Sequence, residues 1–215
     1  MSAAQRRFVP AAGSDWLLPL YDPFTRLLGT ASALQRLIGQ ARLSAGQRVL
    51  DLGCGTGALS LLAKRAQPGV EIVGLDPDPK ALARARRKAE RAGLALAFEQ
   101  GFGDELPFAD ASFDRVLSSF MFHHLESAQK PPVLREVLRV LRPGGSFHLL
   151  DFGGAGHGPG AFLARLVHRE ESLHANTDDA LTALMRAAGF ADAAETEQRR
   201  SPLGGLIYYC ARSHA

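Results

Sequence analysis

Short apolar runs alternate with amphipathic stretches along most of this chain. An apolar run of four to eight residues is typical of a strand, whereas apolar residues that recur with a period near 3.6 indicate a helix. The expected strands are residues 49–52, 70–76, 94–99, 115–119, 146–151, 190–198 and 203–211, and the expected helices are residues 58–66, 77–92, 131–141, 161–169 and 176–188. Strands that alternate with helices predict a doubly wound α/β sheet, and the turn at residues 201–205 predicts a closing antiparallel hairpin.

The chain before the first strand holds a further set of apolar residues. Residues 16–24 are dense in large apolar groups, and apolar residues recur at helical spacing from Leu27 to Ile38. We expect one domain over residues 1–215, with residues 1–43 as an N-terminal helical cap or lid and residues 44–215 as the core. Two interpretations of the first part stay open, a structural cap packed on the sheet and a lid over a pocket.

Composition restricts the classes of partner. The 215 residues are 46% hydrophobic and carry a net charge of +3, which suits one α/β domain and does not demand nucleic acid. The two cysteines have no spacing for a metal site or a disulfide framework, so we expect a reducing, cytoplasmic setting. No apolar run reaches the ~18 residues of a membrane span. His168 and His174 are six positions apart, which does not place both on one helical face, and no metal site is expected.

The first expected strand runs directly into a glycine-rich loop. Asp51 is followed by Gly53, Gly55 and Gly57 at every second position, with Cys54 among them, and the next helix begins immediately afterwards. Glycine accepts backbone conformations that are closed to other residues, and its missing Cβ lets a ligand approach the main chain. The start of the helix also directs unpaired N–H groups towards that space. The loop is therefore the expected ligand site.

The spacing of these glycines selects among ligands. It does not fit the Gly-x-Gly-x-x-Gly dinucleotide pattern, which disfavours a nicotinamide oxidoreductase, and no lysine follows Gly57 as a P-loop requires. An acidic residue followed by Gly-x-Gly-x-Gly instead resembles the first motif of the class I S-adenosylmethionine (SAM)-dependent methyltransferases. The resemblance implies a Rossmann-like sheet of seven strands in the order 3-2-1-4-5-7-6, with strand 7 antiparallel, and SAM as the cofactor.

Further motifs carry the same resemblance. The second expected strand ends at Asp76, 25 positions after Asp51 and directly before Pro77. A carboxylate at that position can accept hydrogen bonds from both ribose hydroxyls of a nucleoside, and the alternative is a helix N-cap. The Leu-Pro-Phe run at residues 106–108 and the Val-Leu-Arg-Pro-Gly-Gly run at residues 140–145 are typical of the branch that includes ubiquinone and menaquinone C-methyltransferases.

The chain departs from this family pattern at Phe102. Aligned on the Leu-Pro-Phe run, Phe102 replaces the aspartate that accepts from the adenine amino group in the family. The N–H of Gly103 still suits a ring nitrogen of adenine. The Phe102 ring can stack on the purine or only fill space, and Asp104 is an alternative, displaced acceptor.

The fourth expected strand ends near two histidines. The resemblance implies that a main-chain carbonyl near Ser119 takes the methionine ammonium of SAM. His123 and His124 follow it, and each is a candidate general base or a structural histidine.

The acceptor side of the site has weaker candidates. Tyr21 and Phe24 suit an apolar substrate pocket to which His124 also contributes, and Asp22 is a further candidate base. The resulting hypothesis is transfer of a methyl group from SAM to a small-molecule acceptor by in-line displacement. The alternative is a regulatory or scaffold protein that binds SAM without turnover.

Overall fold

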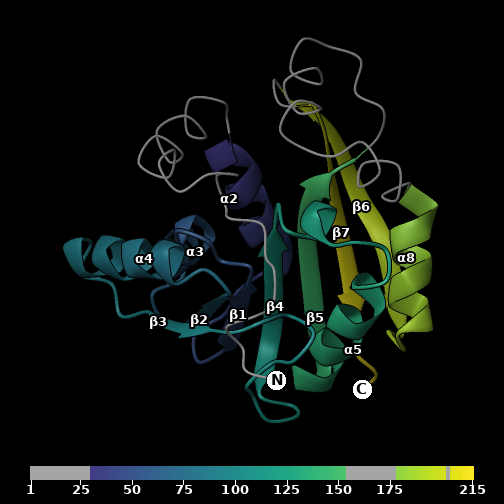
Figure 1. Cartoon of the computed structure of the whole chain (residues 1–215), viewed down its shortest axis with the longest axis horizontal. Helices are drawn as coiled ribbons and strands as arrows, with labels where there is room; N and C mark the ends of the chain where they lie inside the picture. Colours follow the sequence, from purple (N-terminus) through teal and green to yellow (C-terminus); the bar gives the residue numbers. More distant parts are fainter. Residues whose placement is uncertain (1–29, 154–177, 202–203) are drawn as a thin grey trace.

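The computed structural model describes residues 30–153, 178–201 and 204–215, and its centre is a seven-stranded sheet in the order β3-β2-β1-β4-β5-β7-β6 (Figure 1). The elements in chain order are α2 (Thr30–Ala41), β1 (Arg48–Leu52), α3 (Ala58–Ala66), β2 (Glu71–Asp76), α4 (Pro79–Arg91), β3 (Ala97–Gln100), β4 (Phe113–Ser119), η3 (Phe122–His124), α5 (Lys130–Val140), β5 (Leu141–Phe152), α8 (Asp178–Ala187), β6 (Asp192–Ser201) and β7 (Gly204–Arg212).

The strand directions follow the expected topology. Strands β3, β2, β1, β4 and β5 run parallel, while β7 runs antiparallel to both of its neighbours, β5 and β6. The fold expected from the sequence, with its strand order and antiparallel strand 7, is confirmed. In a parallel sheet of this kind the carboxyl ends of the strands meet at one edge, so the loops after β1, β2 and β4 lie together beside the end of β5.

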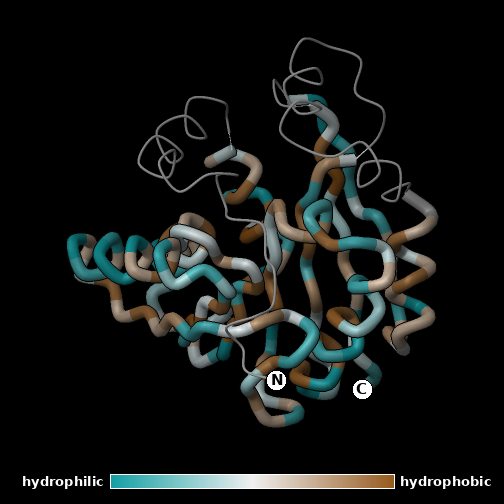
Figure 2. The backbone as a smooth tube through the Cα atoms, in the orientation of Figure 1, coloured by the Kyte–Doolittle hydropathy of each residue, from teal (hydrophilic) through white to brown (hydrophobic). Residues whose placement is uncertain are grey.

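Both faces of the sheet are covered, which explains why the central strand β1 is buried on both sides. Val49 of β1 packs in a cluster with residues of α2 and α3, whereas the next residue, Leu50, packs in a second cluster with residues of α5 and α8. Successive side chains of a strand point to opposite faces, so one short strand serves two cores. Figure 2 shows brown, hydrophobic segments in the strands and teal, hydrophilic turns along α4.

Helix α2 packs on the sheet through its apolar stripe. Leu37 is fully buried, the Tyr208 hydroxyl donates to the Ala33 carbonyl (3.3 Å), and the Gln40 amide donates to the Tyr209 carbonyl (2.9 Å). The part of the N-terminal segment that the structure describes thus forms part of the core. Residues 1–29 lie outside the described residues, and the lid stays a prediction.

The boundary before the fifth strand differs from the sequence-based expectation. Residues 142–145 were expected to separate a helix from the fifth strand, but the structure includes them in β5. The pairing with β4 is irregular there, because the register shifts between Phe113 and Arg115, and Gly144 has a positive φ of 72°. The turn-forming sequence is therefore absorbed as a bulge. Within the described residues, no helix has the length and apolar character that a membrane crossing requires.

Candidate functional site

The glycine loop connects β1 to α3 and is closely packed from two sides. Gly53, Gly55 and Gly57 have φ values of 72°, 52° and 79°. A Cβ on Gly53 would lie 2.5 Å from Cγ of Met121, and one on Gly57 would lie 3.0 Å from Cβ of Ala85. Larger residues at these two positions would be strained by both conformation and contact, which explains the glycines in the motif.

Hydrogen bonds from the loop to β2 hold it in place. The N–H groups of Gly53 and Cys54 both donate to the Leu75 carbonyl, at 2.8 and 3.0 Å. The N–H of Gly55 donates to Oδ2 of Asp76 at 2.8 Å. These three hydrogen bonds fix the loop against the end of β2.

Asp76 ends β2 and organises the backbone around it. Besides the bond from Gly55, its Oδ1 accepts from the N–H of Asp78 at 2.9 Å. The N-cap of α4 is Asp78, which accepts from the N–H of Lys80 at 2.8 Å, and so Asp76 is not that cap. A carboxylate offers about four acceptor sites, so two backbone bonds leave acceptor capacity for a ligand. Burial raises the pKa of Asp76, which lies 8% exposed.

Asp51 lies at the base of the loop with one oxygen unsatisfied. Its Oδ2 accepts from the Ser60 hydroxyl at 2.5 Å, while among the described residues its buried Oδ1 has no hydrogen-bond partner. Burial raises the pKa of Asp51 to about 7, against the opposing hydrogen bond from Ser60. A buried acceptor without a partner requires an explanation, and a cationic or hydrogen-bonding ligand at this edge would supply one.

Cys54 contributes only its backbone to the loop. Its side chain is buried in a cluster with Leu82, Ala85 and Phe98, on the side of α4. Burial raises the pKa of the thiol well above its ordinary value, so the group is a neutral packing residue and not a nucleophile.

Pro77, Phe102 and Gly103 lie in the loops after β2 and β3. The carbonyl of Pro77 accepts from the Gln100 side-chain amide at 3.1 Å. Phe102 is half-buried and forms a single antiparallel bridge with Glu105. A Cβ on Gly103 would meet Leu52 at 3.4 Å, which puts this glycine beside the end of β1. Of the two residues expected near the adenine, Gly103 therefore lies beside Leu52, the last residue of β1.

Strand β4 ends in a sharp bend beside the loop. The buried Ser118 hydroxyl donates to the Leu52 carbonyl at 2.8 Å and ties β4 to β1. Ser119, the last residue of β4, is half-buried. Phe120 then adopts φ 55°, a conformation that costs a non-glycine residue free energy, while its N–H donates to the Leu150 carbonyl at 2.9 Å. The bend turns the chain into η3, which carries both histidines.

His123 forms a buried pair with Asp151 at the end of β5. Its Nδ1 lies 2.6 Å from Oδ1 of Asp151, and its backbone N–H donates to Oδ2 at 2.8 Å. The two side chains are only 2% and 1% exposed. A carboxylate accepts hydrogen bonds, so this contact suits a ring that carries a proton on Nδ1.

The surroundings of this pair include a second histidine and a buried cation. The ring of His124 lies 3.9 Å from that of His123, centroid to centroid. Lys130 is 1% exposed, and burial lowers the pKa of its ammonium while the nearby charge of Asp151 raises it.

Sequence reasoning identified both histidines but missed Asp151. The available signal was its position, because Asp51 and Asp76 also stand at carboxyl ends of strands. Tyr21, Asp22 and Phe24 lie outside the described residues, as do the histidines at 168 and 174. In the described part of the chain, no group of three or more His, Cys, Asp or Glu residues could hold a metal ion.

Comparison with known proteins assigns the family. Residues 49–145 match the family model described as a methyltransferase domain. The chain is 36% identical over 198 residues to demethylmenaquinone methyltransferase of Thermus thermophilus, which covers 81% of this chain and 89% of that protein. The chain belongs to the class I SAM-dependent methyltransferases. It is thus an enzyme of the family branch that includes the quinone-type methyltransferases.

Other relatives of this methyltransferase are longer. It is 40% identical over 139 residues to demethylmenaquinone methyltransferase of Deinococcus radiodurans, a match to 63% of this chain and 57% of that protein. Phosphoethanolamine N-methyltransferase 2 of Haemonchus contortus, solved with S-adenosyl-L-methionine, has a TM-score of 0.70 at 18% identity, covering 87% of this chain and 53% of that chain. At this identity the likeness shows a shared fold.

Proposed function

We propose that this enzyme transfers the methyl group of SAM to a small-molecule acceptor by in-line displacement at the edge formed by β2, β1, β4 and β5. One observation carries the proposal: the glycine loop with Asp76 and the His123–Asp151 pair stand at the ends of neighbouring strands. Such an edge of a doubly wound sheet is where ligands bind. We infer that the cofactor site and a candidate base meet at this edge.

The residues present fit SAM. Asp76 keeps acceptor capacity for two ribose hydroxyls, and the unsatisfied oxygen of Asp51 suits a cationic ligand. Gly53 and Gly55 present main chain to the ligand without a Cβ. The remaining contacts that we propose are Phe102 and Gly103 to the adenine, Pro77 beside the ribose, and the Ser119 carbonyl to the ammonium.

The side chains of the enzyme then need only orient the acceptor and remove its proton. SAM supplies, when bound, a methyl group made electrophilic by its sulfonium. His123 removes a proton from the acceptor through Nε2, and Asp151 fixes the ring orientation and stabilises the imidazolium. His124 is the second candidate for this role, since its ring lies against that of His123. An acceptor with an acidic O–H or C–H group suits this arrangement.

The experiment is a transfer assay with SAM labelled in its methyl group. The Thermus relative is named for demethylmenaquinone, so a demethylmenaquinone with a short side chain is the first acceptor to offer, followed by pooled metabolites. We expect a product that has gained one labelled methyl group. Binding of SAM without label in any acceptor would favour the regulatory or scaffold function, which the departure at Phe102 motivates.

A further inference from the structure

Helix α3 presents an apolar face away from the sheet. Ala58, Leu61, Leu62 and Arg65 recur at i, i+3, i+4 and i+7 and so share one face, on which Leu61 is buried, Leu62 is half-buried, and Ala58 and Arg65 are exposed. The outer face of a surface helix is normally polar. Here three of its four positions are apolar.

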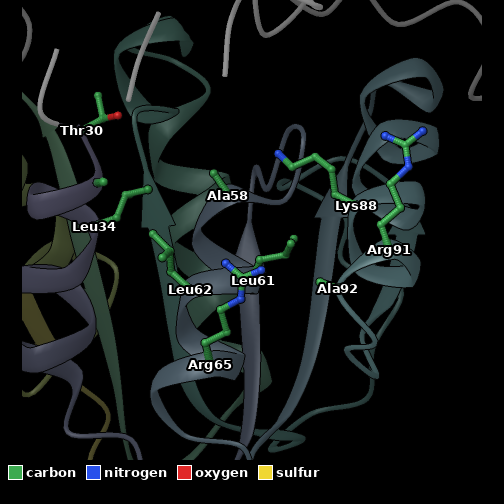
Figure 3. Close-up of a pocket in the computed structure, with 10 residues that line it drawn as sticks. Thr30, Leu34, Ala58, Leu61, Leu62, Arg65, Lys88, Arg91 and Ala92 are labelled. Carbon is green, nitrogen blue, oxygen red and sulfur yellow. The ribbon is translucent and has the colours of Figure 1, made fainter. Parts of the chain in front are cut away.

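Two neighbouring helices turn this face into the floor of a groove. Thr30, Ala31 and Leu34 of α2 line one wall, and Lys88, Arg91 and Ala92 at the end of α4 line the other (Figure 3). The enclosed volume is about 280 Å³. That is close to the lower end of small-molecule pockets, roughly 300–1,000 Å³. The groove lies on the helical layer, between α2 and α4 over α3, and one end of it reaches Ala58 at the start of α3.

The charge along the groove has one sign. Its ionisable lining residues are Arg65, Lys88 and Arg91, and among the described residues no acidic side chain lines it. Figure 3 shows the Lys88 ammonium reaching from α4 towards α3, and the Arg65 guanidinium extending along α3 past Leu61. The Lys88 ammonium also donates to the Thr56 hydroxyl at 3.2 Å, which holds it at the end of the groove near the glycine loop.

A ligand that matches this lining needs an anionic head and an apolar body. Guanidinium groups bind phosphate with paired N–H donors, and an ammonium adds a compact charge beside them. Leu34, Leu61 and Leu62 offer the apolar contact that a bare anion would not use. We propose that this groove is a second ligand site, which binds a phosphate monoester with a short apolar chain, its phosphate on the cations and its chain on the leucines.

Calorimetric titration of the full-length enzyme tests this site with three probes: octyl phosphate, inorganic phosphate and 1-octanol. We expect octyl phosphate to bind at least about tenfold more tightly than either of the others, because it alone uses both halves of the groove. The Arg65→Gln/Arg91→Gln variant should lose at least about tenfold in affinity for octyl phosphate. The matched control, Arg84→Gln/Arg87→Gln, removes two charges from α4 outside the groove and should bind as the wild type does.

Vesicles distinguish a free ligand from a membrane surface. Phosphatidylglycerol vesicles carry a phosphate head that is embedded in a bilayer, and phosphatidylcholine vesicles are the neutral control. The proposal is overturned if octyl phosphate does not bind, if inorganic phosphate binds equally well, or if the control variant loses as much affinity as the groove variant. Binding to anionic vesicles without binding of octyl phosphate would also overturn it, since that result describes charge attraction over the whole basic face of α4.

Discussion

The single carboxylate of Asp76 accepts hydrogen bonds from two backbone N–H groups and is also the proposed acceptor for the ribose of SAM. Its oxygens accept from the N–H groups of Gly55 and Asp78, at 2.8 and 2.9 Å, and thereby set the loop that approaches the cofactor. The same burial that raises its pKa makes each hydrogen bond to it stronger than in water. Loss of the carboxylate would therefore remove direct ligand contacts and loosen the loop.

Asp76→Ala is expected to reduce SAM affinity at least tenfold. Two charge-assisted hydrogen bonds at about 1.5–3 kcal/mol each support a loss of that size or more. Calorimetry with SAM measures it, and circular dichroism checks that the variant remains folded. Asp78→Ala is the control, because it removes the N-cap of α4 two residues away without removing the proposed ribose acceptor. Unchanged SAM affinity in a folded Asp76 variant would contradict the ribose contact.

Phe102 tests how the adenine is held. Phe102 is half-buried in the loop after β3, and a contact of its ring with the purine would contribute about 0.5–1.5 kcal/mol. We expect Phe102→Ala to weaken SAM binding modestly. Phe102→Asp should bind SAM more tightly than the Ala variant, because a carboxylate restores an acceptor for the adenine amino group. If Asp binds no better than Ala in titrations under one buffer, the acceptor is elsewhere, and exposed Asp104 is the next residue to substitute.

Local sequence patterns predicted one part of the candidate site. The other part forms only when strands that are far apart in the sequence pair with each other. The glycine loop and Asp76 could be predicted because each follows directly from a strand and its next turn. The pair of His123 and Asp151 could not, since the two residues are 28 positions apart and meet only through the register of β4 on β5. The direction of the Cys54 side chain likewise depends on α4 packing against the loop, which no local pattern specifies.

The His123–Asp151 pair at the ends of β4 and β5 leads to a prediction about turnover. Replacing His123 with Asn should reduce kcat by about 10²–10⁴-fold while SAM affinity changes little, because general base catalysis contributes a factor of that size. Asp151→Asn should act in the same direction through the orientation of the imidazole. Transfer of labelled methyl groups and SAM titration measure the two effects separately.

His124→Asn is the comparison variant for the His123–Asp151 pair. The ring of His124 neighbours that of His123, and both hydrogen bonds to Asp151 described above come from His123. A larger loss of kcat in this variant than in His123→Asn would transfer the role of the base to His124. Full activity in both variants would show that the reaction needs neither histidine.

For the whole molecule, two buried groups make the free energy of unfolding depend on pH in opposite directions. Asp51 has a pKa raised from 3.8 to about 7, so its contribution to stability is present below pH 3.8 and is lost as the pH rises through 7. His148 has a pKa lowered from 6.5 to about 4, chiefly by burial, so its contribution is present above pH 6.5 and is lost as the pH falls through 4. The two dependences oppose each other between pH 4 and 6.5.

Substituting Asp51 or His148 should reveal the pH dependence of stability that the other residue causes. Without SAM, Asp51→Asn is expected to leave a protein that loses roughly 3 kcal/mol more than the wild type does on acidification from pH 6.5 to 4, at about 1.36 kcal/mol per pKa unit. His148→Gln should instead lose roughly 3 kcal/mol relative to the wild type as the pH rises from 4 to 7. Urea unfolding at a series of pH values measures both. Parallel curves for the three proteins would contradict these assignments.

The central claim is that SAM binds at the carboxyl edge of β1, β2 and β4, with its reactive end beside His123. The most direct measurement is a crystal structure of the enzyme with S-adenosylhomocysteine, which has the same nucleoside and amino acid parts as SAM. We expect both ribose hydroxyls on the Asp76 carboxylate, the adenine beside Phe102 and Gly103, and the sulfur directed towards the end of β4. A ligand bound elsewhere, or one at this edge whose ribose does not contact Asp76, would contradict the proposed SAM site.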